Sequence, residues 1–170
     1  MRLYTPRVLS QNRLVPDPRR SLAAQLVLVL LGTWLGALLL FGSVVAPAAF
    51  AVAPTPAVAG NLVGRVLAAL DWAGLAAGLT LAGISIWLGR GLWTVALPVF
   101  MSLSCLLSRL FLAPEIAALR PLLGDASARA RFGLLHGLSV GLFGALLLAG
   151  LALIVLHVRA LGTKKKRLIS

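Results

Sequence analysis

The stretch LAAQLVLVLLGTWLGALLLFGSVVA, residues 22–46, decides the fold class of this chain. It contains no charged side chain and only isolated polar residues. A helix needs roughly 20 predominantly apolar residues to cross a bilayer, because lipid offers backbone amides and carbonyls no hydrogen-bond partners. The stretch meets that length, so it predicts a helix that spans a membrane.

Three later stretches have the same character, at residues 66–88, 92–112 and 133–156. Each is long enough to cross a bilayer and holds very few ionisable residues. Hydrophobic residues form 60% of the chain, which is well above the share in a soluble globular protein. The predicted fold class is therefore all-α: an integral membrane four-helix bundle, with both termini cytoplasmic.

The length of 170 residues fits one domain with a basic segment at each end. We interpret residues 1–20 as a basic cytoplasmic arm and residues 21–160 as the four-span transmembrane domain. Residues 161–170 then form a basic cytoplasmic tail. The arm and the tail hold most of the basic side chains of the protein.

The charge balance supports this orientation. Lys and Arg number 16 against 4 Asp and Glu, and the formal net charge is +12. The basic residues gather beside the spans, so contact of the termini with anionic lipid explains them better than nucleic acid does. With both termini cytoplasmic, eleven basic residues fall on the inner face and four fall in outer loops. The excess of basic residues on the cytoplasmic face is the usual bias of membrane proteins.

Local signals predict where the helices begin and end. Ser21 is a candidate N-cap of the first span. That span is expected to end at residues 44–47, where Pro47 kinks or stops the helix because proline disrupts a helix interior. Thr55 can cap a new helix that has Pro56 at its first position. Residues 89–91, Gly-Arg-Gly, predict a tight turn that makes the second and third spans antiparallel neighbours.

Three ionisable residues are expected at a similar depth in the membrane. Asp71, Arg109 and His136 each lie four or five residues inside a span, measured from the same outer surface. At 1.5 Å per residue this depth is roughly 5 to 8 Å. We place three further polar residues in the same layer: Ser43, Glu115 and Arg131.

Two interpretations of this polar cluster stay open. Charges within the apolar zone are costly, so they persist when they are paired or reached by water. In the functional interpretation, the cluster is a substrate, ion or proton site open to the outer side, with His136 as its titratable member. In the structural interpretation, Asp71 and Arg109 form an ion pair that fixes the helix register, and His136 bonds to a neighbour.

Other chemistry lacks the residues it needs. His136 and His157 are 21 positions apart on one helix, or roughly 30 Å, so one monomer cannot place both on one metal or haem. Cys105 is the only cysteine and is expected to be a small buried side chain. No hydrolytic carboxylate pair or nucleophile motif occurs. We expect no enzymatic activity, no metal site and no cofactor, with haem or copper as the alternative.

Glycines recur at four-residue spacing, which lets membrane helices approach closely. The pairs and rows are Gly32 with Gly36, Gly60 with Gly64, Gly74 with Gly78, and Gly133 with Gly137 and Gly141. They predict either a seam between two copies or packing within one bundle. Both interpretations stay open.

Three stretches together carry a family resemblance: residues 34–50, 59–65 and 131–139. Residues 114–120 also fit. In this order they resemble a bacterial family of unknown function related to transmembrane protein 205. The resemblance implies a four-helix membrane protein without an established biochemical activity. The wider fold group is similar to copper-resistance membrane proteins and a haem-pathway membrane oxidase, and of the residues here only His136 lies in a matching motif.

We therefore expect a multi-pass protein of the bacterial inner membrane that acts as a non-catalytic accessory or structural subunit of a membrane assembly. A membrane-protein partner or a second copy would complete it. The first alternative is a small transporter or metal-handling protein that uses the outer-face Asp/Arg/His cluster. The second alternative is a haem-binding membrane redox protein with His136 as a ligand.

Overall fold

The structure is a computed structural model that describes the backbone of residues 18–166 and the side chains of residues 18–159. Residues 1–17 and 167–170 lie outside it, so most of the expected basic arm and the last residues of the tail are not addressed. The elements in chain order are α1 (Pro18–Leu40), the π-turn η2 (Phe41–Val45), α2 (Ala46–Val52), α3 (Pro56–Trp87), α4 (Leu92–Leu107), the π-turn η3 (Ser108–Leu112), α5 (Ala113–Leu119), the 3-10 turn η4 (Arg120–Leu122) and α6 (Ala126–Lys166).

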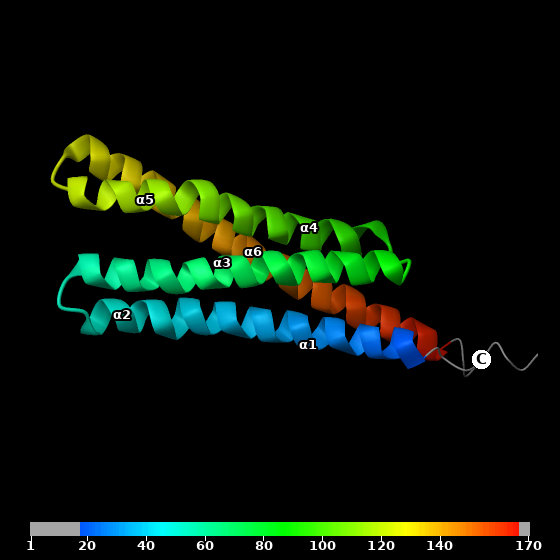
Figure 1. Cartoon of the computed structure of the whole chain (residues 1–170). Coiled ribbons are helices and arrows are strands. Elements are labelled where there is room, and N and C mark those ends of the chain that lie inside the picture. The colour runs from blue at the N-terminus through cyan, green and yellow to red at the C-terminus, as the bar shows by residue number, and fades with distance from the viewer. Residues whose placement is uncertain (1–17, 167–170) are drawn as a thin grey trace, which may run out of the picture.

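These elements form four long helical segments, called rods below, and Figure 1 shows them as two antiparallel hairpins. Four segments are long and apolar enough to cross a membrane: Pro18–Val52, Pro56–Trp87, Leu92–Leu122 and Ala126–Arg159. The prediction of an all-α bundle with four such helices is confirmed. We call the end that holds α2 and α5 the α5 end. The end where α1 begins and α6 finishes is the terminal end (Figure 1).

The hairpin turns follow the chemistry expected from the sequence. Thr55 caps α3, because its side-chain oxygen accepts a hydrogen bond from the Val58 amide at 3.3 Å, and Pro56 takes the first helical position. Gly89 has a φ of 62°, a left-handed conformation that glycine adopts without steric cost. The tight turn between α3 and α4 is therefore confirmed.

Two expected helix limits are wrong. Ser21 is not an N-cap, because α1 already runs from Pro18. Pro47 does not end the first helix, which continues through η2 and α2 to Val52. Proline removes a backbone donor and its ring crowds the carbonyl four residues earlier. A π-turn ahead of the proline widens the helix there, with the Ala46 amide bonded to the Phe41 carbonyl.

The second hairpin contains the same combination of a π-turn followed by a proline. Pro114 lies 67 positions after Pro47, and η3 begins at Ser108, which is also 67 positions after Phe41, the first residue of η2. The buried positions keep the same offset along the two helices. The matching buried pairs are Val27 and Thr94, Leu31 and Pro98, Trp34 and Met101, Leu35 and Ser102, Leu38 and Cys105, Phe41 and Ser108, and Ala49 and Ile116.

The returning helices α3 and α6 repeat as well, with an offset of 72 positions. The sequence AGLTL at residues 77–81 corresponds to AGLAL at residues 149–153. The matching buried pairs are Gly74 and Leu146, Ala77 and Ala149, Gly78 and Gly150, Leu81 and Leu153, and Ser85 and His157. The bundle therefore consists of two hairpins with the same order of helices and corresponding buried positions.

The two hairpins do not meet symmetrically. Gly78 lets α3 approach α4 so closely that a Cβ there would lie 2.8 Å from the Pro98 carbonyl oxygen. Helix α6 instead crosses the other rods at an angle, beside α5 at one end and beside α1 at the other (Figure 1). The core follows this crossing, with Val27, Leu31 and Leu153 fully enclosed.

Candidate functional site

A buried carboxylate occupies the interface between α3 and the second hairpin. Asp71 lies on α3 with only 5% of its surface exposed. The Ser108 hydroxyl donates a hydrogen bond of 2.9 Å to Asp71 Oδ2. A buried carboxylate is costly unless such donors compensate it, so Ser108 is the residue that allows Asp71 to lie there.

The π-turn η3 positions the partner of Asp71. Ser108 is its first residue, and its carbonyl oxygen accepts a hydrogen bond from the Ala113 amide, five residues later. Arg109 follows directly and lies close enough for its charge to act on Asp71. No direct ion pair joins the two side chains within the described part of the chain. Arg109 also has a buried Nε without a hydrogen-bond partner.

Further polar atoms lie along the same face of α3. A Cβ on Gly74, one turn after Asp71, would lie 2.7 Å from Cys105 Sγ and 2.8 Å from Trp34 Nε1. Trp34 is 5% exposed, and its Nε1 has no hydrogen-bond partner. The interior at this level therefore contains one carboxylate and two donors, Trp34 Nε1–H and Arg109 Nε–H, that are free to bind an acceptor.

The repeat places a contrasting pair at the corresponding position. Phe143 corresponds to Asp71, and Phe41 corresponds to Ser108, by the offsets that relate the two hairpins. The rings of Phe41 and Phe143 are in contact, with centroids 5.9 Å apart and planes inclined by 54°. One interface is thus closed by a polar pair and the equivalent interface by an aromatic pair.

The structure brings only part of the expected cluster together. His136 is exposed on α6, where its ring stacks on Phe132 of the same helix with centroids 5.7 Å apart. The Ser43 hydroxyl donates to the Leu39 carbonyl of its own helix at 2.6 Å. Among the described residues, neither His136 nor Ser43 is hydrogen-bonded to Asp71 or to Ser108.

The remaining two residues of the expected cluster form a separate pair at the α5 end. Arg131 Nη2 lies 2.7 Å from Glu115 Oε2, and the two side chains are 64% and 53% exposed. An exposed pair of this kind contributes about 0 to 1 kcal/mol. It links α5 to the start of α6 without building a site.

The four glycine sets differ in what covers them. Gly74 and Gly78 face α4 and α1, so they serve packing inside the bundle. Gly60 and Gly64 face the guanidinium of Arg120, which also donates to Asn61 Oδ1 at 2.9 Å. A Cβ would meet nothing within 4 Å at the five others: Gly32, Gly36, Gly133, Gly137 and Gly141.

Sequence reasoning missed several polar residues of the interior. Ser108, Trp34 and Ser85 are ordinary in membrane helices, so their types alone gave no signal. The recurrence of Ala-Pro at residues 46–47 and 113–114 was visible and identifies the π-turn that holds Ser108. Among the described residues, no group of three or more His, Cys, Asp or Glu is arranged to hold a metal ion.

Four apolar rods with a buried polar interior define a multi-pass membrane protein of the four-helix class. A family model described as a domain of unknown function, DUF4149, matches residues 29–124, and the chain belongs to this family. A search of curated proteins and a search of solved structures each found no match. The matched region begins within α1, covers the rest of the first hairpin and the helical segment from α4 to η4, and ends before α6.

Proposed function

We propose that the protein is a non-catalytic subunit of a membrane assembly and that the half of α6 near the α5 end docks a helix of its partner. Gly133, Gly137 and Gly141 support this proposal, because all three are exposed and have open space in front of them. Lipid gives helices no hydrophobic drive to associate, so rows of small residues that permit close backbone contact are the usual seam.

The comparison with the first hairpin carries the proposal. The α5 end of α3 also has glycines at four-residue spacing, Gly60 and Gly64, each one position before the repeat equivalent of Gly133 or Gly137. There the guanidinium of Arg120 fills the space in front of them. Nothing from the described chain fills the space in front of Gly133 and Gly137. A helix from another chain would cover this surface as Arg120 covers the first.

The membrane location and orientation expected from the sequence fit this role. We place the protein in the bacterial inner membrane with both termini cytoplasmic and in contact with anionic lipid, because the basic residues concentrate at the terminal end. The motifs at residues 34–50 and 59–65 support a relation to the group around transmembrane protein 205.

A second candidate function rests on Asp71. The Phe41–Phe143 contact indicates that apolar side chains can close the equivalent interface, so packing alone does not require a carboxylate there. This observation favours a small transporter that uses Asp71, Ser108 and Arg109 as an ion or proton site. In proteoliposomes, this candidate predicts a proton or sodium flux that Asp71→Asn abolishes and Glu115→Gln leaves intact. A flux that is absent, or that survives Asp71→Asn, would reject it.

The subunit proposal is tested by the native mass of the protein extracted in a mild detergent. We expect the wild type to carry the additional mass of one defined partner chain, and Gly137→Leu to release it. Gly83→Leu is the matched control, because Gly83 is also exposed on a spanning helix with nothing within 4 Å. A wild type that runs as a lone chain, or a Gly137→Leu protein that keeps its partner, would overturn the proposal.

A further inference from the structure

The terminal end of the bundle holds a second group of polar atoms, which the proposed docking role does not use. Ser85 and His157 are 0% and 2% exposed, and Arg90 lies in the turn between α3 and α4. Ser85 Oγ, His157 Nε2 and Arg90 Nη1 are all buried without a hydrogen-bond partner among the described residues. Buried polar atoms are rarely left unpaired in folded proteins, so three in one region call for a ligand.

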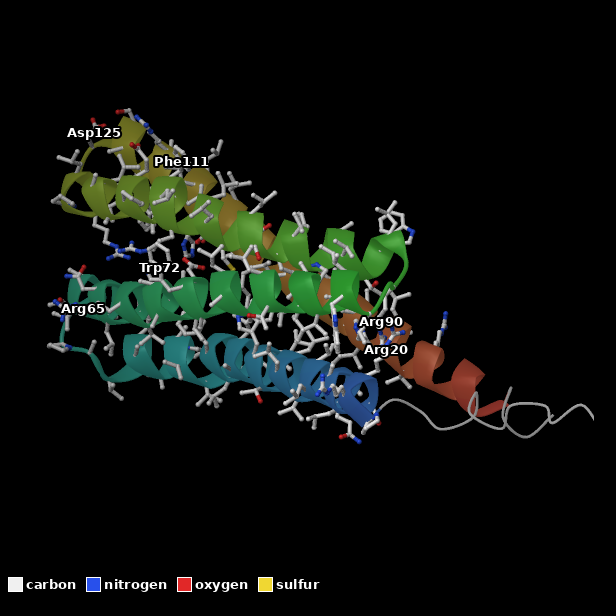
Figure 2. The ribbon with its side chains drawn as sticks, turned by 45° about the vertical axis from the view of Figure 1, so that its right-hand side comes forward. Arg20, Arg65, Trp72, Arg90, Phe111 and Asp125 are labelled. Carbon is white, nitrogen blue, oxygen red and sulfur yellow. The ribbon has the colours of Figure 1, made fainter. Side chains whose placement is uncertain are left out.

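These three residues come from separate elements at the terminal end: Ser85 from α3, Arg90 from the turn and His157 from α6. The Arg90 amide donates to the Ser85 carbonyl at 3.0 Å, which holds the turn against the end of α3. The charge of Arg90 acts on His157, so the guanidinium lies near the imidazole of α6. Ser85 and His157 occupy equivalent positions in the two hairpins, and both are buried in the bundle. Figure 2 shows Arg90 and Arg20 at this end of the bundle.

The Arg90 guanidinium has no ion-pair partner among the described carboxylates. Of the four acidic residues, Asp71, Glu115 and Asp125 lie in the middle of the bundle or toward the α5 end, and Asp17 lies outside the described residues. Burial lowers the pKa of the Arg90 guanidinium, and no described carboxylate pairs with it. A half-buried cation without a partner is costly, and an anion would remove that cost.

We propose that Arg90, Ser85 and His157 form a binding site for a phosphate group at the terminal end of the bundle. Arg90 is half-buried, so part of its side chain lies at the surface of the bundle. The phosphate comes from the headgroup of an anionic lipid or from free inorganic phosphate, which have the same donor requirements. The basic surroundings at this end favour either source.

The donors match a phosphate in number and type. The Arg90 guanidinium supplies a charge-assisted hydrogen bond from Nη1, and the Ser85 hydroxyl supplies a neutral one. His157 Nδ1 lies 2.9 Å from the Leu153 carbonyl oxygen, which only accepts, so Nδ1 carries a hydrogen and Nε2 is free to face the ligand. A bound anion favours the imidazolium, whose Nε2–H then donates to it.

The test uses the full-length protein, stripped of lipid in detergent and titrated with phosphatidylglycerol, phosphatidylcholine or inorganic phosphate. Native mass spectrometry counts bound lipid, and the melting temperature reports bound phosphate. Arg90→Gln removes the central charge. Arg159→Gln is the matched control, because it removes an equal charge from an exposed position at the same end. Ser85→Ala removes the buried hydroxyl alone.

We expect preferential binding of phosphatidylglycerol, which Arg90→Gln weakens about tenfold and Arg159→Gln changes by less than about twofold. Ser85→Ala should weaken binding about fivefold without lowering the melting temperature of the lipid-free protein, since its hydroxyl has no partner there. Stabilisation by inorganic phosphate with the same dependence on Arg90 would assign the site to free phosphate. Equal effects of Arg90→Gln and Arg159→Gln, or no preference for either phosphate source over phosphatidylcholine, would overturn the proposal.

Discussion

The interface between α3 and α4 and its counterpart between α1 and α6 are built from the same repeat but are closed in different ways. The first contains the Asp71–Ser108 hydrogen bond and the close contact at Gly78. The second contains the Phe41–Phe143 contact and ends near its middle, where α6 turns away toward α5. The polar interface is the tighter one, and the aromatic interface leaves the glycine face of the other half of α6 uncovered.

The two copies of the hairpin therefore form interfaces with different properties. The close interface contains the buried carboxylate of Asp71. The open interface leaves Gly133, Gly137 and Gly141 exposed to lipid or to another helix. The effect of changing the polar pair can therefore be compared with that of changing the aromatic pair. In the same way, the uncovered glycines of α6 can be compared with Gly60 and Gly64, which Arg120 covers.

The largest expected effect on stability distinguishes the close helix contact at Gly78 from the equivalent contact at Gly150. In Gly78→Ala the new Cβ meets the Pro98 backbone and Ser102, whereas in Gly150→Ala it meets the Leu35 side chain, which can move. We expect Gly78→Ala to lower the free energy of unfolding by about 3 kcal/mol and Gly150→Ala by about 1 kcal/mol. Reversible unfolding in mixed detergent measures both, and equal losses would contradict the asymmetry.

The next comparison concerns the two pairs that close the interfaces. Phe143→Ala leaves a gap beside Phe41 and should cost about 2 kcal/mol of unfolding free energy. Asp71→Leu removes a buried carboxylate together with its desolvation cost, so stability should change by less than about 1 kcal/mol. The same unfolding measurement checks this prediction. A loss above about 3 kcal/mol in Asp71→Leu would make the Asp71–Ser108 pair a structural requirement.

The smallest expected effect contrasts the caps of the two returning helices. Thr55 caps α3 with a neutral hydroxyl, so Thr55→Ala should cost about 1 kcal/mol at every pH. Asp125 caps α6 by accepting from the Ala128 amide at 2.9 Å and from the Ser127 hydroxyl. These donors lower the pKa of Asp125 below its ordinary value of 3.8.

The lowered pKa sets the sign of the pH dependence. Asp125 stabilises the folded protein fully above pH 3.8, and this contribution is lost as the pH falls through the lower pKa of the folded state. Asp125→Asn should therefore reduce the loss of stability on acidification, whereas Thr55→Ala should not. Unfolding followed between pH 6 and about pH 2 distinguishes them. An unchanged acid response in Asp125→Asn would show that other groups control it.

The four rods and their turns could be predicted because each depends on local chemistry. Long apolar stretches, the Thr55-Pro56 cap and the Gly89 turn act within a few residues of chain. Pro47 misled the prediction, because a proline ends a regular helix but a π-turn accommodates it. The equivalent proline, Pro114, could have indicated from the sequence that both prolines follow a π-turn within a continuing helix.

The candidate site was predictable only in part, since depth in the membrane does not fix direction around a helix. Asp71 and Arg109 were expected at one level, and the structure places them near one another. His136 instead faces outward on α6, which crosses the bundle at an angle that its own sequence does not reveal. The roles of Ser108 and of the unpaired polar atoms of Ser85, Arg90 and His157 could be identified only from the helix interfaces in the structure.

The docking role of α6 is tested most directly by photo-crosslinking in intact membranes. A photoreactive amino acid replaces Leu138, which is exposed beside the glycine row, or Leu79, which is exposed on α3. We predict one adduct of defined mass from position 138 and none from position 79. The absence of an adduct from position 138, or equal adducts from both positions, would contradict a partner helix on this face.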